Sequence, residues 1–175
     1  ERLAQRGGPP HQGTNLALAA VAADRLCELL GRPGPTSDQL LALAEHFEGL
    51  PSRHATVSLR GGIRWIDDAL ASNPFAAAAA LDAVGAAPVA WLIGGQSREV
   101  ALDPMCDALR RRGDAATLLS GLPDTGAEWC DRLAASLSED RHRPHVGRAV
   151  RTRFVGSVAE AVSLVADAIP EGGAV

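Results

Sequence analysis

A chain of 175 residues is long enough for one core of ordinary size, and 46% of its residues are hydrophobic although only 3% are aromatic. The formal net charge is −4 and lysine is absent, so nucleic acid and acidic membrane surfaces are poor candidate partners. We expect no membrane helix and no signal peptide, because no apolar run reaches the roughly 18 residues that a membrane helix needs. Three widely spaced cysteines without CxxC spacing argue against a zinc or disulfide framework and suit a reducing cytoplasm.

The first third of the chain predicts a pair of helices. Residues 16–30 are rich in alanine and leucine, with Thr14 or Asn15 as the expected N-cap. A second helix is expected over residues 37–46, where leucines form an apolar stripe. The glycine and proline in residues 49–54 interrupt the pattern. We therefore predict a domain boundary there.

Beyond this boundary the pattern changes to strands alternating with helices. A strand pair turns at Gly61 and Gly62, and a helix follows to about Val84. Further strands are expected over residues 88–93, 115–119 and 151–154, with helices over residues 104–112, 128–138 and 158–168. Ala174 and Val175 look like the start of one more strand. The alternation predicts an α/β fold, a Rossmann-like three-layer domain with a mostly parallel sheet.

The segment from Trp65 to Pro74 is the first candidate for a functional site. It reads as a strand that ends in two carboxylates, Asp67 and Asp68, followed by a short polar loop and a helix. Open α/β folds bind ligands at the carboxyl ends of their strands, where backbone amides and helix N-termini converge. A site is therefore expected at this edge of the sheet.

Four motifs resemble, in order, those of the Mur ligases, the ATP-dependent amide ligases of peptidoglycan precursor synthesis. Residues 11–19 (HQGTNLALA) are similar to the HNxxN motif, and residues 47–53 (FEGLPSR) to the FxGLxHR junction. Residues 66–74 (IDDALASNP) are similar to the NDSKATNP loop. Residues 92–98 (LIGGQSR) are similar to the LILGGxDKG loop of the MurD-like branch, which adds glutamate to UDP-N-acetylmuramoyl-alanine. The resemblance covers nearly the whole chain.

The resemblance implies a division into two parts of a longer ligase. Residues 1–48 correspond to the helical end of the central ATPase domain. Residues 50–175 correspond to the C-terminal α/β domain, incomplete at its C-terminus, which binds the incoming amino acid and closes over ATP. No GxxxxGK[ST] phosphate loop occurs in the sequence, and the domain that binds the UDP-sugar is missing. We therefore expect a fragment that is inactive alone and belongs to a monomeric, cytoplasmic parent.

Three residues are implied in nucleotide binding. Arg53 corresponds to the junction arginine, and a guanidinium suits phosphate or ribose because it stays charged and donates several hydrogen bonds in one plane. The alternative for Arg53 is a structural salt bridge across the domain junction. Asp68 corresponds to the carboxylate that reaches the ribose, with N-capping of the following helix as its alternative. Gln12 stands where the family has the asparagine near adenine.

Another three residues are implied at the amino-acid substrate: Ser72, Asn73 and Arg98. Ser72 keeps the hydroxyl of the family threonine, and Asn73 is unchanged. Leu70 and Arg98 replace two lysines that face carboxylates of the amino acid or product. Leucine cannot do this, whereas arginine can bind a carboxylate bidentately. These departures favour the branch that attaches L-glutamate.

The resemblance thus implies a ligase that phosphorylates a carboxylate with ATP and then admits an amine to the acyl phosphate. Its substrates would be UDP-N-acetylmuramoyl-L-alanine and glutamate, and magnesium would be held mainly by the missing central domain. No residue is assigned to catalysis or to a metal. The rival hypothesis is a non-catalytic Mur-like binding or scaffolding module that has lost the family lysines.

Two further groups of side chains have simpler interpretations. His46, His54, His142 and His145 are candidates for a metal or general-base site. His142 and His145 lie in an arginine-rich segment without a carboxylate at helical spacing, so a solvated loop is favoured over a metal site. Arg110, Arg111 and Arg112 are expected at a helix C-terminus, where they complement the helix dipole.

Overall fold

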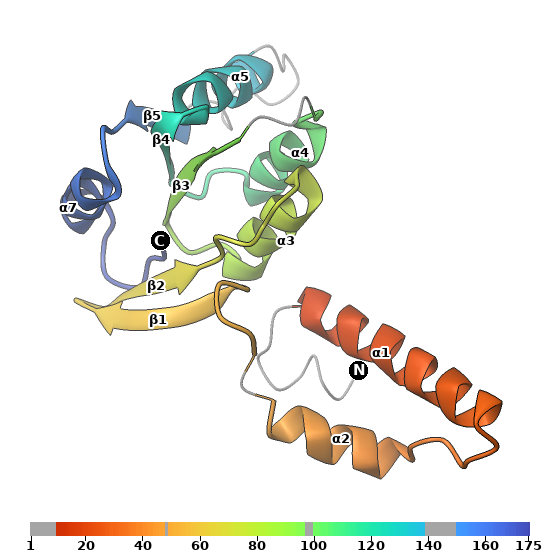
Figure 1. The fold of residues 1–175 in the computed structure, drawn as a ribbon. Coiled ribbons are helices and arrows are strands. Elements are labelled where there is room, and N and C mark those ends of the chain that lie inside the picture. The colour runs from red at the N-terminus through yellow and green to blue at the C-terminus, as the bar shows by residue number, and fades with distance from the viewer. Residues whose placement is uncertain (1–9, 48, 97–99, 139–149) are drawn as a thin grey trace. The chain divides into compact units, whose positions relative to one another are not determined.

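The computed structural model describes residues 10–47, 49–96, 100–138 and 150–175 (Figure 1). The chain divides into two compact units, Glu1–Leu50 and Pro51–Val175. The division falls inside the sequence break that we predicted over residues 49–54. That the first unit is the end of a central ATPase domain remains a prediction.

The described residues of the first unit form two helices, α1 (Pro10–Leu29) and α2 (Ser37–Glu45). The predicted N-cap of the first helix is wrong, because α1 begins at Pro10 and carries Thr14 and Asn15 inside it. Proline suits a first helical position, since its fixed φ is already helical and its missing N–H would have no helical partner. Helix α2 has a capping box, in which the Thr36 hydroxyl accepts from the Gln39 amide and the Gln39 side chain accepts from the Thr36 amide.

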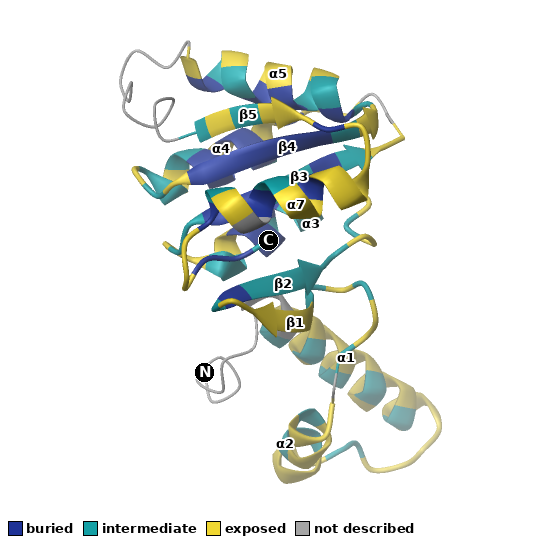
Figure 2. Ribbon diagram, turned by 90° about the vertical axis from the view of Figure 1, so that its left-hand side faces the viewer, coloured by how far each residue is buried: buried dark blue, intermediate teal, exposed yellow. Residues whose placement is uncertain are grey.

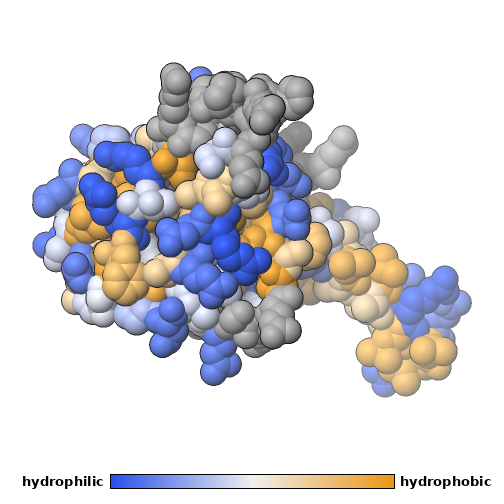
Figure 3. All heavy atoms as spheres, turned by 90° about the horizontal axis from the view of Figure 1, so that it is seen from above, coloured by the Kyte–Doolittle hydropathy of each residue, from blue (hydrophilic) through white to orange (hydrophobic). Residues whose placement is uncertain are grey.

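Apolar side chains stay exposed on these two helices. Leu29 is 85% exposed, Leu43 is 68% exposed and Phe47, just after α2, is 61% exposed. Figure 2 colours both helices yellow and teal, and Figure 3 shows orange hydrophobic spheres on the helical unit at its right-hand side. The described residues of this unit therefore form no buried core, and their apolar side chains leave an exposed hydrophobic surface.

The second unit consists of five strands and four helices within the described residues, beginning with a strand hairpin. The strands are β1 (Ala55–Arg60), β2 (Ile63–Asp67), β3 (Val89–Gly95), β4 (Thr117–Asp124) and β5 (Val150–Phe154). The helices are α3 (Pro74–Val84), α4 (Asp103–Arg112), α5 (Gly126–Ser138) and α7 (Val158–Ala168). The hairpin turns at Gly61 and Gly62, both at positive φ, as the glycine pair predicts.

The C-terminal residues join the hairpin to the rest of the sheet. Strands β1 and β2 are antiparallel, and β3, β4 and β5 are parallel in that order. Ala174 bridges Arg64 of β2 and Val89 of β3 in parallel on both sides. The Ile66 amide donates to the Val175 carbonyl at 2.8 Å, and the Ala90 amide donates to the Ala174 carbonyl at 2.9 Å. The predicted last strand is therefore confirmed, and it lies between β2 and β3.

Helices cover both faces of this sheet, which confirms the predicted three-layer α/β fold. Helices α3, α4 and α5 lie on one face and α7 on the other (Figure 1). The main core centres on the first face, with Leu81, Leu109 and Leu133 each at most 2% exposed. A smaller cluster on the other face joins Leu118 of β4 to Val165 of α7. Strand β4 is the most buried strand in Figure 2.

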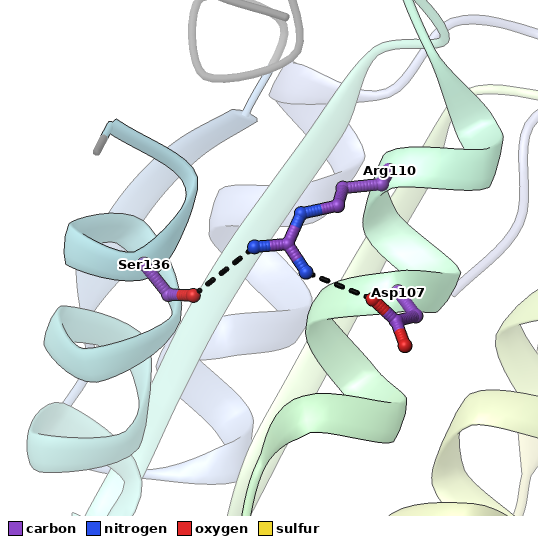
Figure 4. Close-up of polar contacts among 3 residues, drawn as sticks. All are labelled: Asp107, Arg110 and Ser136. Carbon is purple, nitrogen blue, oxygen red and sulfur yellow. Dashed lines mark hydrogen bonds and ion pairs between the residues drawn. The ribbon is translucent and has the colours of Figure 1, made fainter. Parts of the chain in front are cut away.

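The three consecutive arginines at the end of α4 bind protein groups. Arg110 contacts Asp107 at 2.8 Å and reaches Ser136 of α5 at 3.4 Å (Figure 4). Arg111 makes a bidentate contact with Asp82 of α3 at 3.1 and 2.7 Å. Arg112 donates to the Ala87 carbonyl and to Thr117, so it connects the end of α4 to the α3–β3 loop and to the start of β4. These contacts agree with a structural role.

Within the described residues, no helix combines the length and apolar character needed to span a bilayer.

Candidate functional site

A cleft of about 710 Å³ lies at the carboxyl ends of the central strands. Its wall includes Asp67 and Asp68 after β2, Gly94 and Gly95 at the end of β3, and Leu122 near the end of β4. The first residues of α3 and α7 also line it, and it extends between α3 and the sheet. This is the edge at which the sequence predicts a ligand, because the N-termini of the crossover helices converge there.

An acidic loop (residues 67–73) is tied to the junction segment (residues 52–54) by both carboxylates. The Ser52 hydroxyl donates to Asp67 Oδ2 at 2.8 Å, and the His54 amide donates to Asp68 Oδ1 at 2.8 Å. Asp67 Oδ1 also accepts from the Ala69 amide at 3.0 Å. The hydrogen bonds from Ala69 and then Ser52 lower the pKa of the Asp67 carboxyl, because they favour its charged form.

Arg53 belongs to the same set of contacts. Its Nη1 donates to the Leu70 carbonyl at 2.9 Å, and the Leu70 amide donates back to the Ser52 carbonyl at 3.1 Å. This bond uses one of the five N–H donors of a guanidinium. The Arg53 side chain is exposed beside the cleft, next to His54, which lines it.

The junction segment holds an unusual backbone. Ser52 and His54 have φ of 55° and 51°, and Asp124, at the end of β4, has φ of 72°. Left-handed backbone at non-glycine residues costs free energy and persists only where surrounding contacts impose it. The hydrogen bonds from Ser52 and His54 to the two carboxylates supply such contacts.

The acidic loop ends at the N-terminus of α3, where Asn73 is the N-cap. Asn73 Oδ1 accepts from the Ala76 amide at 3.0 Å, and Pro74 occupies the first helical turn. Capping of α3 by Asp68, the alternative interpretation from the sequence, is therefore wrong, because Asp68 lies five residues before the cap and binds His54. Ser72 and Asn73 both line the cleft with Asp68.

The loop after β3 forms the far side of the cleft. Gly94 packs so tightly that an added Cβ would lie 2.7 Å from Leu122 Cβ, and Gly95 has φ of 118°. The Thr125 hydroxyl donates to the Gly95 carbonyl and anchors the loop to the start of α5. Arg98 lies outside the described residues. The position of the guanidinium that was predicted at the amino-acid substrate is therefore not described.

The remaining candidates do not lie at this cleft. Gln12 lies in α1 of the other unit, and its side chain is not described. His142 and His145 fall outside the described residues, and the His46 ring binds the Ala42 carbonyl at 2.8 Å. Across the described ranges, no group of three or more histidine, cysteine, aspartate or glutamate side chains could hold a metal ion.

Comparison with known proteins places the chain in a family. A UDP-N-acetylmuramoylalanine–D-glutamate ligase of Frankia casuarinae is 37% identical over 78% of this chain and 25% of its own length. A UDP-N-acetylmuramoyl-L-alanine–L-glutamate ligase of Salinispora tropica is 31% identical over 94% of this chain and 33% of its own length. The chain belongs to the Mur ligase family. It spans about a quarter to a third of the length of these Mur ligases.

A solved structure supports the fold. A murein peptide ligase of Psychrobacter arcticus matches with a TM-score of 0.51 at 16% identity, over 78% of this chain and 28% of its own. No protein-family model matches the chain. The predicted resemblance to the Mur ligases is thus confirmed by the homologues, and the fold is consistent with a C-terminal part of such a ligase.

Ser52 and Trp129, at or beside the cleft, were not predicted from the sequence, and His54 was considered only for a metal or general-base site. Ser52 and His54 act through the local backbone and through bonds to residues fifteen and fourteen positions away. The only signal from the motif is that Ser52 lies in the FxGLxHR-like junction (residues 47–53) and that His54 follows it directly. Trp129 is one of three tryptophans in a chain that is poor in aromatics, which was an available signal.

Proposed function

We propose that this chain is the C-terminal part of an ATP-dependent ligase that adds glutamate to UDP-N-acetylmuramoyl-L-alanine. Two observations together support the proposal. The chain is homologous to glutamate ligases, and its cleft brings Asp68, Ser72 and Asn73 together at the strand ends. The chain's share of the work would be to present the amino acid and to close over ATP. Positioning of this kind can supply much of a two-substrate reaction's rate.

The rim near the acidic loop fits a nucleotide. Asp68 lines the cleft, and a carboxylate can accept hydrogen bonds from ribose hydroxyls. Arg53 lies beside it with donors suited to phosphate, and its bond to Leu70 orients it without neutralising its charge. ATP would supply the phosphoryl group that activates a carboxylate, and magnesium would be held mainly by the ligase's central domain, in which Gln12 would approach adenine.

The other end of the cleft fits the amino acid. Ser72 offers a hydroxyl, Asn73 an amide, and the loop carrying Arg98 begins at Gly94 and Gly95 on the opposite wall. At Gly95, where no atom lies within 4 Å of an added Cβ, a ligand can approach the backbone. A cytoplasmic location and a role in cell-wall synthesis, and with it in cell shape and division, follow from this proposal.

The rival function is a non-catalytic Mur-like module, which the loss of lysine favours. Leu70 cannot bind a carboxylate, and the sequence contains no lysine that could replace it. The same cleft would then hold a ligand or partner without turnover. Turnover by the full-length protein therefore separates the two functions.

The test is ATP-dependent phosphate release by the full-length protein that contains this chain. It is given UDP-N-acetylmuramoyl-L-alanine with either L-glutamate or D-glutamate. We expect release with one enantiomer, and the L form is favoured by the departures at Leu70 and Arg98. No release with either enantiomer would refute the ligase and leave the binding module.

A matched pair of variants connects activity with the cleft. Asp68→Asn keeps an oxygen that can accept from the His54 amide but removes the charge offered to the ribose, so we expect the KM for ATP to rise about tenfold. Asp114→Asn removes an exposed charge before β4, at the opposite end of the sheet, and should leave KM unchanged. Equal behaviour of the two variants would contradict the role of Asp68.

A further inference from the structure

The junction segment and the acidic loop continue the antiparallel course of β1 and β2. Ala55 and Asp67 are the first and last residues of these two strands and lie opposite each other. Further along, the Leu70 amide donates to the Ser52 carbonyl at 3.1 Å, and Arg53 Nη1 donates to the Leu70 carbonyl at 2.9 Å. All of these residues belong to the second unit. Arg53 is therefore held beside the acidic loop by the backbone next to it as well as by its own side chain.

Asp67 lines the cleft, but each of its oxygens accepts a hydrogen bond from the protein. Oδ1 accepts from the Ala69 amide at 3.0 Å, and Oδ2 accepts from the Ser52 hydroxyl at 2.8 Å. The bonds from Ala69 and then Ser52 lower the pKa of the carboxyl, so Asp67 is charged at neutral pH. Hydrogen bonds to a charged group are stronger than those between neutral groups. Asp67 is therefore suited to hold Ser52 in place.

The backbone of Ser52 needs such a contact. Its φ of 55° lies in the left-handed region, which serine rarely adopts unless surrounding contacts impose it. Two bonds hold the residue there, one from its hydroxyl to Asp67 and one from the Leu70 amide to its carbonyl. Loss of the first bond would let Ser52 relax toward a commoner conformation, and Arg53, the next residue, would move with it.

Both partners of the hydroxyl–carboxylate bond depart from the motifs that the chain resembles. Ser52 stands at the histidine of FxGLxHR. When Asp68, Leu70 and Asn73 are aligned with the aspartate, lysine and last asparagine of NDSKATNP, Asp67 stands at its first asparagine. Two departures fifteen positions apart are thus joined by one bond. The contact comes from the residues of this chain and is not given by the motifs.

We propose that Ser52 and Asp67 are a pair of positioning residues that hold the Arg53 guanidinium at the nucleotide end of the cleft, on the rim that carries Asp68. This inference rests on the proposed ligase function. In this arrangement Arg53 and Asp68 contact the nucleotide, and the pair acts only through them. The amino-acid end of the cleft does not depend on the pair.

The kinetic test uses Ser52→Gly in the full-length protein, because glycine adopts a φ of 55° readily and lacks the hydroxyl. We expect the KM for ATP to rise about fivefold or more, while the KM for glutamate stays within about twofold. Asp124→Gly is the matched control, because Asp124 also has left-handed backbone and does not line the cleft. An unchanged KM for ATP in an active Ser52→Gly protein would overturn the proposal while leaving the ligase function intact.

A double-mutant cycle tests whether Ser52 acts through Asp67. Asp67→Ala should raise the KM for ATP to a similar extent, and adding Ser52→Gly to it should raise that KM no further. Multiplied effects in the double variant would mean that the two residues act independently, which refutes the pair. Asp67→Ala alone decides the case in which Ser52→Gly fails to fold, because an unchanged KM for ATP would again contradict the proposal.

A binding measurement separates the pair from the ligase function. Wild-type and Ser52→Gly full-length proteins are titrated with magnesium ATP by calorimetry, without the other substrates, so turnover is not required. We expect the variant to bind ATP about fivefold more weakly. Equal affinities would refute the positioning pair, whether or not the wild-type protein releases phosphate.

Discussion

Asn73 combines a structural contact with a proposed substrate contact, and the two can be separated by mutation. Its Oδ1 accepts from the Ala76 amide at 3.0 Å and caps α3, whose first-turn proline provides no donor of its own. Asn73→Ala removes this acceptor, and loss of an N-cap side chain costs about 1 kcal/mol, within a range of about 0.5–2. For a domain of this size the melting temperature should fall by about 2–5 °C.

Asn73→Asp supplies the control. Aspartate keeps the capping oxygen and adds a negative charge at a helix N-terminus, so the free energy of unfolding should equal or exceed that of the wild type. Aspartate also removes the amide N–H₂ donor, so a substrate role predicts a raised KM for glutamate in a fully stable protein. Urea unfolding and glutamate kinetics on both variants make the separation.

Two results would refute this reasoning. An Asn73→Ala protein as stable as the wild type would show that the cap contributes nothing. An Asn73→Asp protein with wild-type kinetics would show that Asn73 only caps α3. The amino-acid site would then depend on Ser72 and Arg98.

Three other predictions concern stability and reactivity. The bonds from Ala69 and Ser52 lower the pKa of the Asp67 carboxyl, so the carboxylate stabilises the fold at pH values above its unfolded pKa. This contribution is lost as the pH falls through the lower pKa of the folded state. In Asp67→Asn, the free energy of unfolding measured with urea should therefore fall less steeply with decreasing pH. Arg112→Lys should lower the free energy of unfolding by about 2 kcal/mol, because bonds from the guanidinium to the Ala87 carbonyl and the Thr117 hydroxyl are lost. Arg132 is exposed, so Arg132→Lys should change the free energy of unfolding by under about 0.5 kcal/mol. Burial raises the pKa of the Cys130 thiol to about 11, so at pH 8 a thiol reagent should label the partly exposed Cys27 well before Cys130, and equal labelling rates would contradict this.

The fold was largely predictable because its signals are local and periodic. Short apolar runs alternate with helical segments, and glycine pairs mark the hairpin and the last strand, so the βαβ pattern needs no long-range information. The start of α1 was missed because a proline at a first helical position looks like part of the preceding Gly-Pro loop. Boundaries are set by backbone bonds that sequence periodicity reports only approximately.

The candidate site was predictable only in part. Asp68, Ser72 and Asn73 follow one strand and come together because the strand ends there. The hydrogen bonds of Asp67 and Asp68 to the junction segment depend on left-handed backbone at Ser52 and His54, and no propensity of serine or histidine predicts that conformation. The burial of the Trp129 indole arises from packing against core residues far away in the sequence, which local sequence patterns do not report.

The contacts of Leu70 bear on whether the absence of lysine argues against a ligase function. The Leu70 amide donates to the Ser52 carbonyl, and the Leu70 carbonyl accepts from Arg53. Leu70 itself is 49% exposed and does not line the cleft. The conformation of the loop therefore does not require a particular side chain at this position, and Leu70→Lys should change the free energy of unfolding by under about 0.5 kcal/mol. If Leu70→Lys leaves glutamate kinetics unchanged as well, the cation that neutralises the substrate carboxylate comes from elsewhere in the site, and the absence of lysine no longer favours a non-catalytic module. A large gain in activity would instead mean that the natural leucine has weakened the enzyme.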